Sequence, residues 1–558
     1  MKNKIFRLFP LAGILLSLVA CNDVIDIPAT DRLDQNAIWS GSEAILDQYV
    51  IGLYGAVREK STLKMNDSQF TDCMTDILKD ADWTQSRRYN RKMFNYEPFN
   101  SDDASILSNW GDSYTRIRRF NEFLRDVKIY GDLYNTNFLK PRIAEVRYMR
   151  AMQYFYLIRV YGGVVLRDHY PGPEENDQPR LSEAESWQWV IDEIKACIPD
   201  LPVAWEASNF SRMTRVAAYG FLSRVALYAK QWDVVIEAAD SCALLGAGLE
   251  PVYADIFANH FSKENLMVVD FQPTGLNHNA DQLFRPAGDN ANHGNKGFGV
   301  PITPTAEFAD AFEMADGTPF SWAAYNANPA AWGNDPFSGR EPRFYATILY
   351  NNEDWEGRKI EAYEGGADGI QKFWKSTTTP SATCTGYYFR KYITEGDHSW
   401  DAAGSNHFDI MLRYGEVLLN KAEALAQKDW AANQTAALKA LNDIRARVSL
   451  PGKTASSLDD FMNILEHERI VELGGENFRF WDLRRWRKGV ERLNNVSFHG
   501  VLIKKDDTAP GGFTYEVSDC DDTPSGLRVF MERYYCFALP SSELNNNAAL
   551  GGVNNPGW

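Results

Sequence analysis

The chain has 558 residues, a formal net charge of −17 at neutral pH and 44% hydrophobic residues, enough for several domains or one large helical array. A surface this acidic repels polyphosphates, which argues against nucleic acid as a partner and against binding to anionic membranes through a basic patch. The seven cysteines are scattered without a CxxC pair, so neither a disulfide framework nor a zinc site is indicated, although one pair could be bridged.

The first twenty residues have the pattern of an export signal. Lys2, Lys4 and Arg7 form a basic start, 9–18 is apolar, and Leu-Val-Ala precedes Cys21. The apolar run has about half of the roughly 20 residues that a membrane-spanning helix needs. We therefore predict a lipoprotein signal peptide over 1–20, cleaved before Cys21, whose amine and thiol are then acylated. A plain signal peptide is the alternative.

Apolar residues at helical spacing predict a mostly α-helical mature chain, 21–558. Paired antiparallel helices that repeat along a chain are typical of a tetratricopeptide-like scaffold, expected over about 40–260 and 408–490. Between these parts, about 265–405 is rich in Gly, Pro, Asn, Asp and aromatic residues and predicts a large irregular loop region that is functional rather than a linker. The tail, 491–558, is expected to form loops and short strands. Individual helices are expected near 104–128, 141–162, 183–198, 214–230, 232–244, 408–428, 433–447 and 457–474.

The helices and the tail carry specific sequence motifs in a fixed order. They are AEVRYMRA (144–151), YGGV (161–164), RYGEVLLNKAEA (413–424), LNDIRAR (441–447), ERIVEL (468–473), RFWDLRRW (479–486), FALP (537–540) and NPGW (555–558). The ordered set resembles the SusD/RagB family of Bacteroidetes lipoproteins. The acidic stretch at 22–28 is similar to the one that sends such lipoproteins to the cell surface. The chain departs from the family pattern at Gly415, where alanine is usual, and at Gly475, where a bulkier residue is common.

The resemblance implies a nutrient-binding outer-membrane lipoprotein without catalysis or cofactor. Its partner would be a SusC-like TonB-dependent transporter, which takes in the captured oligosaccharide. The family implies a lipid-anchored position at the cell surface. Some members bind peptides, so peptide binding is the alternative within the family, and a surface glycoside hydrolase is the alternative from another class.

Three acidic or metal-like patterns in the sequence could indicate catalysis. Glu416 and Glu423 lie seven residues apart on one predicted helix, a spacing that does not exclude a glycosidase pair, but Arg413 offers Glu416 an ordinary helical ion pair. His467 begins an HExxH-like motif whose second histidine is absent. Asp519, Asp521 and Asp522 lack the remaining positions of a calcium loop. We expect no catalytic residue and no metal.

Aromatic residues in loops are the better indication of a ligand site. Trp and Tyr suit sugars because an apolar ring can lie on the sugar face while neighbouring polar groups meet the hydroxyls. The resemblance places ligand aromatics in an early loop and in the irregular region, and each residue has packing against the scaffold as its alternative. The candidates are Asp82, Trp83, Arg88, Tyr89, Trp322, Tyr325, Trp332 and Trp374.

Overall fold

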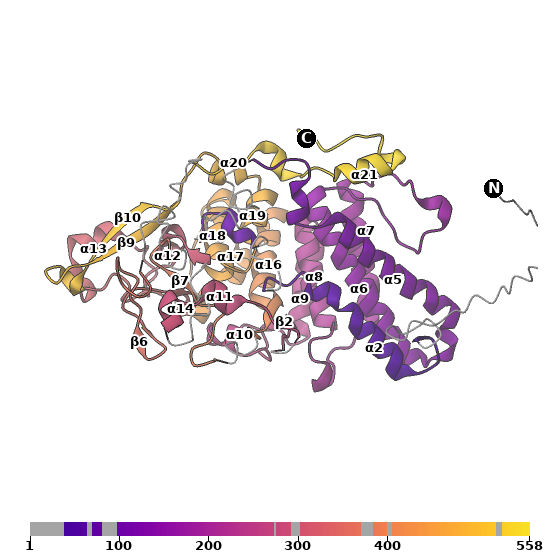
Figure 1. Ribbon diagram of the computed structural model, residues 1–558, viewed down its shortest axis with the longest axis horizontal. Coiled ribbons are helices and arrows are strands. Elements are labelled where there is room, and N and C mark those ends of the chain that lie inside the picture. The colour runs from indigo at the N-terminus through magenta and orange to yellow at the C-terminus, as the bar shows by residue number, and fades with distance from the viewer. Residues whose placement is uncertain are drawn as a thin grey trace, which may run out of the picture.

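The computed structural model describes residues 38–63, 70–80, 98–272, 275–291, 302–369, 383–398, 404–520 and 527–558. Helices dominate and all sheets in these ranges are two-stranded, which confirms the predicted fold class (Figure 1). No helix within the same ranges combines the length and apolarity needed to cross a bilayer.

The scaffold is an array of antiparallel helices in which each helix packs on its neighbour. Its first part consists of α5 (Trp110–Tyr130), α6 (Thr136–Tyr161), α7 (Glu183–Cys197), α8 (Arg215–Tyr228) and α9 (Trp232–Leu244). Its second part consists of α16 (Tyr414–Lys428), α17 (Trp430–Arg447) and α18 (Leu458–Leu473). Because α9 packs directly on α16, the two parts form one continuous array despite the long segment between them. The amino-terminal α2 (Glu43–Leu53) and α3 (Gly55–Arg58) pack on α6.

Local sequence signals fix several helix starts. Ser182 and Glu185 form a capping box at α7: the Glu185 amide donates to Ser182 Oγ at 3.2 Å and the Ser182 amide donates to Glu185 Oε2 at 2.9 Å. Asn135 caps α6, so this helix begins five residues before its predicted start near 141. Gly162 ends α6 with a φ of 73°, in agreement with the predicted helix end near 162.

The predicted helix over 408–428 is wrong in its first residues. Strand β8 (Asp409–Arg413) pairs antiparallel with β2 (Asn265–Val269), and α16 begins only at Tyr414. A short apolar run is compatible with both a helix and a strand, and here pairing with a distant segment decided the outcome.

The region between the scaffold parts consists of short elements joined by loops. Its strand pairs are β1 (Leu78–Asp80) with β3 (Ile302–Pro304), β4 (Ile348–Leu349) with β7 (Tyr388–Phe389), and β5 (Asp354–Trp355) with β6 (Arg358–Lys359). Its helices are α10 (Asp255–Ala258), α11 (Ala280–Phe284), α12 (Ala306–Ala311), α13 (Trp322–Ala327) and α14 (Pro342–Thr347).

The tail contains short helices and the longest hairpin among the described strands. Strands β9 (His499–Lys505) and β10 (Phe513–Asp519) pair over seven residues each. The helices that follow α18 are α19 (Arg479–Arg485) and α20 (Gly489–Leu493), before the hairpin, and α21 (Ser541–Asn546), after it. The hairpin and α13 lie together at the end of the molecule opposite α5 (Figure 1).

A buried network of charged side chains joins the scaffold to the irregular region. Arg413 contacts Glu264 Oε1 at 2.9 Å, Glu472 Oε1 at 2.7 Å and Glu476 Oε2 at 2.7 Å. Arg447 also binds Glu472, at 2.5 Å. The network comprises the acids Glu264, Glu313, Glu341, Glu468, Glu472 and Glu476 and the cations Arg343, Lys391, Arg413, Arg445, Arg447 and Lys453.

Glu472 of α18 is the acid on which three arginines of this network converge. Burial by itself raises the pKa of its carboxyl, but Arg447, Arg413 and Arg343 outweigh burial and hold that pKa below its usual range. Glu472 is therefore ionised in the folded protein, and its charge is matched only as long as all three arginines stay in place.

Gly415 leaves the space that this network occupies. A Cβ atom at Gly415 would lie 2.8 Å from Glu264 Oε1 and 2.9 Å from Glu472 Oε1, and closer still to Arg413 Nη1. The departure from the alanine of the family pattern therefore has a local cause: the network fills the volume of the methyl group.

We expect Glu472→Gln to lower the free energy of unfolding by about 3–5 kcal/mol, because it leaves buried guanidinium groups without their counter-charge. Urea unfolding followed by circular dichroism measures this loss. Glu532→Gln is the matched control, since Glu532 pairs with Arg487 on the exposed surface and its loss should change stability by about 0.5 kcal/mol or less.

The same comparison has an expected pH dependence. A carboxyl whose folded pKa lies below its unfolded value of 4.5 stabilises the fold above that pH, and this contribution disappears as the pH falls through the folded pKa. The difference between wild type and Glu472→Gln should therefore narrow below about pH 4.5. A difference that stays constant down to pH 3 would contradict the assignment.

We further expect Gly415→Ala to destabilise the protein by about 1–3 kcal/mol, the usual cost of overpacking, although alanine is the better helix former. Gly52→Ala is the control, because Gly52 lies in α2 with open space around the position of a Cβ atom. That variant should be neutral or more stable by up to about 1 kcal/mol. Thermal unfolding measures the stability of both variants. Stabilisation by Gly415→Ala would contradict the expectation, because it would mean that the network rearranges to accommodate the methyl group.

Candidate functional site

Three of the candidate aromatic residues lie in the described part of the chain. Trp322 and Tyr325 are on α13, and Trp332 ends the 3-10 turn that follows, Pro329–Trp332. Ser321 caps α13 by accepting the Ala324 amide at 3.2 Å, and Gly333 ends the turn in the left-handed region with a φ of 64°. The other candidates, Asp82, Trp83, Arg88, Tyr89 and Trp374, lie outside the described residues, as does Cys21.

The three rings belong to one aromatic cluster. Tyr325 lies between the tryptophans, with ring centroids 6.3 Å from Trp322 and 6.0 Å from Trp332, both edge-on. Phe320 contacts both tryptophans edge-on, at 5.2 and 5.8 Å. Tyr515 of β10 lies 5.7 Å from Trp322 with an interplanar angle of 31°. The tail hairpin thus supports α13 from a distant part of the sequence.

The members of the cluster differ in exposure. Tyr325 is buried, with 3% of its surface exposed, so its ring faces are used for packing. Trp322, Trp332 and Tyr515 are half-buried, so part of each ring stays accessible. Edge-on packing by Tyr325 and Phe320 restrains the two tryptophans. The arrangement is suited to a rigid platform of accessible rings, which we call the α13 platform: Trp322, Trp332 and Tyr515.

Two carboxyl groups lie next to the α13 platform. Burial raises the pKa of Asp310, on α12, to about 7, although Arg340 opposes this shift. A side-chain hydrogen bond from Trp322 also lowers that pKa, so the Asp310 carboxyl and the Trp322 indole are direct neighbours. Asp335 accepts the Phe337 amide at 2.9 Å, and burial raises its pKa as well. Both carboxyls could meet hydroxyl groups of a ligand on the platform.

The described residues next to the predicted early loop lie near α12, the helix that carries Asp310. Asp80, the last described residue before 81–97, pairs with Ile302 in the β1–β3 ladder. The next residue of β3, Thr303, contacts Cys384 Sγ at 3.6 Å, just after 370–382. Strand β3 continues directly into α12, which carries Asp310. The described residues that flank the Trp83 and Trp374 segments are therefore neighbours.

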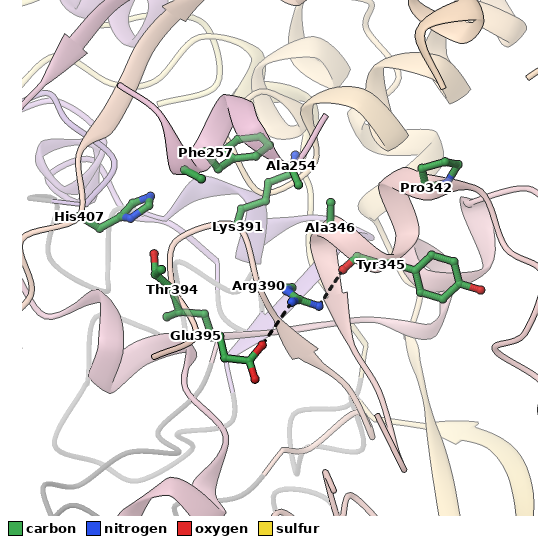
Figure 2. A pocket seen from close by; sticks show the side chains of 12 residues that line it. Ala254, Phe257, Pro342, Tyr345, Ala346, Arg390, Lys391, Thr394, Glu395 and His407 are labelled. Carbon is green, nitrogen blue, oxygen red and sulfur yellow. Dashed lines mark hydrogen bonds and ion pairs between the residues drawn. The ribbon is translucent and has the colours of Figure 1, made fainter. Parts of the chain in front are cut away.

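A separate pocket of about 390 Å³ lies between α10, α14 and the chain after β7 (Figure 2). Arg390 points into it but contacts Glu353 at 2.8 Å, Glu395 at 3.9 Å and the Tyr345 carbonyl at 3.2 Å. Burial and nearby His278 lower the pKa of His407 to about 4, so its imidazole is neutral at neutral pH. Lys391 is held by Glu476 of the buried network. Since its cations already have partners, this pocket is a weaker candidate than the α13 platform.

Comparisons with known proteins identify the family. The sequence profile described as the SusD family matches residues 263–558, more than half of the chain. The chain belongs to the SusD family. A second profile, described as starch-binding associating with outer membrane, matches residues 29–227. The family resemblance that the ordered sequence motifs indicated is thereby confirmed.

Individual SusD-like proteins match along most of their length. A SusD-like protein of Bacteroides ovatus is 23% identical over 475 residues, covering 80% of this chain and 77% of that protein. The SusD-like protein P2 of Formosa agariphila is 22% identical over 98% of both chains. A crystal structure of a SusD-like carbohydrate binding protein of Bacteroides fragilis is 26% identical with a TM-score of 0.75, covering 92% of this chain and all of that one.

The acids that suggested catalysis have structural partners in this SusD-family chain. Glu416 binds Arg224 through two contacts of 2.7 and 2.6 Å, so the predicted pairing of Glu416 with Arg413 is wrong. Arg413 instead enters the buried network, because the strand β8 that carries it precedes the helix. Glu423 binds Arg485 and accepts Trp486 Nε1 at 2.9 Å. Both carboxylates neutralise buried arginines.

The histidine of the HExxH-like motif also has a structural contact. His467 Nε2 lies 2.8 Å from the carbonyl of Ala311. Among the described residues, no group of His, Cys, Asp and Glu has the arrangement of a metal site. Asp521 and Asp522 lie outside those residues.

Tyr515 is the functional candidate that sequence reasoning missed. Its contribution depends on the β9–β10 hairpin, which brings the tail to α13. The alternation of Phe513, Tyr515 and Val517 is a strand signal that was present in the sequence. Nothing in that alternation, however, indicates which distant helix the hairpin contacts.

Proposed function

We propose that this chain is a cell-surface lipoprotein that binds glycans through the α13 platform and passes them to a SusC-like TonB-dependent transporter. The observation that carries the proposal is the set of restrained, half-exposed rings of Trp322, Trp332 and Tyr515 beside the carboxyls of Asp310 and Asp335. Flat apolar rings next to hydrogen-bonding groups match the two faces of a sugar.

The family comparisons support the same ligand class. One matching profile is described as starch-binding, and one similar protein of known structure is described as a carbohydrate binding protein. Another SusD-like protein of known structure binds laminarin and shares the fold, with a TM-score of 0.65. We extend this chemistry to the present chain and propose that it acts by binding alone, because the acids considered for catalysis are engaged in ion pairs.

Trp83 and Trp374 are proposed as further ligand residues, together with Asp82, Arg88 and Tyr89. The described residues that flank their segments lie near β3 and α12, which carries Asp310. Tyr325 is proposed to act by holding the two tryptophans, since its own ring is buried.

We expect Trp322→Ala and Trp332→Ala to weaken glycan binding by about 1–3 kcal/mol each, roughly five- to 150-fold, the range typical of aromatic anchors. The measurement is calorimetry with an oligosaccharide selected on a glycan array, with circular dichroism to check folding. Trp189→Ala is the matched control, because Trp189 is a half-buried tryptophan on α7 that packs on Tyr154, far from α13.

Unchanged affinity in both folded platform variants would refute the platform. Selective binding of peptides, with no glycan bound on the array, would favour the peptide-binding alternative. Release of reducing ends during prolonged incubation with a bound glycan would instead identify a glycoside hydrolase.

The anchoring part of the proposal has its own test. Wild-type protein should incorporate labelled palmitate and co-purify from native membranes, in mild detergent, with a large β-barrel protein. Cys21→Ala should lose the label and the membrane attachment without unfolding, because Cys21 precedes the helical scaffold. A wild-type protein without palmitate would refute the lipoprotein assignment, and purification as a sole component in several detergents would count against the transporter.

A further inference from the structure

A second pocket, of about 220 Å³, lies in the scaffold at the carboxyl ends of α6 and α8. Trp187 of α7, Tyr228 of α8 and Trp481 of α19 form aromatic walls. Five cationic side chains also line it, namely Arg159, Lys230, Arg484, Arg485 and Arg487, against one carboxylate, Glu183. So many cations around one small pocket are unexpected in a chain whose net charge is −17.

Two of these cations are neutralised by the protein itself. Arg485 binds Glu423 and also contacts Asp482 at 2.8 Å. Arg487 pairs with Glu532 on the surface. Arg159, Arg484 and Lys230 have no such partner among the carboxylates of the described chain.

Arg159 is the central residue. Its guanidinium carbon lies 3.6 Å from the ring centroid of Trp481, so the group stacks on the indole. Its Nε is buried and has no hydrogen-bond partner within the described residues. Burial lowers the pKa of Arg159, yet an arginine stays charged at neutral pH. Arg159 has a side-chain hydrogen bond with Tyr228, but no carboxylate of the described residues faces its charge in the pocket wall.

The guanidinium group of Arg484 has hydrogen-bond acceptors, but among the described residues it has no ion pair with a carboxylate. It donates to the carbonyls of Arg159, Tyr534 and Tyr535 at 2.8, 2.8 and 3.0 Å. Lys230 is exposed at the turn after α8. The three cations Arg159, Arg484 and Lys230 and the single carboxylate of Glu183 together give two positive charges. The carboxyl ends of α6 and α8 each offset about half a charge. A net charge of about +1 therefore remains.

This arrangement differs from that of the buried network. There, every arginine faces at least one carboxylate at 3.0 Å or less. In the pocket, the guanidinium groups of Arg159 and Arg484 face aromatic rings, carbonyl groups and open volume. The fold leaves positive charge where an external group can reach it.

We propose that this pocket, the Arg159 pocket, binds a tetrahedral oxyanion, a sulfate or phosphate monoester carried on a sugar. Guanidinium and ammonium groups bind such oxyanions by charge-assisted hydrogen bonds, and Arg159 and Lys230 approach from two elements. The half-buried ring of Tyr228, which packs on buried Trp187, provides a wall for the sugar. The pocket is lined by residues of α6, α7 and α8, helices that lie away from α13 (Figure 1), so its function does not depend on the α13 platform.

The test is calorimetric titration of the purified full chain with glucose 6-sulfate, glucose 6-phosphate, glucose and inorganic sulfate at one fixed ionic strength. Wild-type protein should bind both esters, and glucose should not bind. Arg159→Gln should weaken ester binding by about ten-fold or more, in line with a charge-assisted hydrogen bond. Lys230→Gln, at an exposed turn where folding is not at risk, should weaken it about three- to ten-fold.

Arg125→Gln is the matched control, since it removes one charge from α5 outside the pocket and should leave ester binding unchanged. Esters that bind no better than glucose, or that bind wild type, Arg159→Gln and Lys230→Gln equally, would overturn the proposal. If inorganic sulfate binds as tightly as the esters, the proposed contact between the pocket and the sugar is overturned. Neutral-glycan binding at the α13 platform is measured separately, so failure of one site is distinguishable from failure of the other.

Discussion

The buried network around Arg413 and Glu472 is the interaction on which the arrangement of the other parts depends. Its members come from the scaffold helices α17 and α18, from β8, from α14 and from the chain after β7. Such charges are costly to bury, and their mutual attraction repays that cost only when every partner is in place. A network of this kind is therefore weak evidence of high stability but a strong constraint on geometry. It connects the irregular region to the scaffold in one arrangement.

Packing around the network explains two unusual glycines. Gly415 leaves room for Arg413 and its acids, and Gly475 precedes Glu476 with a φ of 82°. A Cβ atom at Gly475 would lie 2.6 Å from Phe389 Cε2 of β7. Both glycines therefore lie where a larger side chain would clash: with the buried network at Gly415 and with Phe389 at Gly475.

The rigid attachment of the irregular region matters for binding. Aromatic rings contribute to recognition when they are already held in the bound orientation, since less conformational entropy is then lost. Tyr325 and Phe320 hold the accessible tryptophans, and the β9–β10 hairpin adds Tyr515. The Arg159 pocket uses the scaffold differently: its cations lie at helix carboxyl ends, where the helix dipole favours them without supplying a full counter-charge.

The sequence by itself determined the helical class, most scaffold helices, the family and the aromatic candidates, because helical periodicity, capping residues and ordered motifs are local signals. It did not determine that 409–413 is a strand, since pairing with β2 is a long-range contact. It also could not distinguish buried Tyr325 from half-buried Trp322 and Trp332, because Trp322 contacts Phe337 and Tyr515 from other segments and Trp332 contacts Phe320. The partners of Arg413, Glu416 and Arg159 were decided by tertiary structure alone, because charges far apart in the chain become neighbours only when the helices pack.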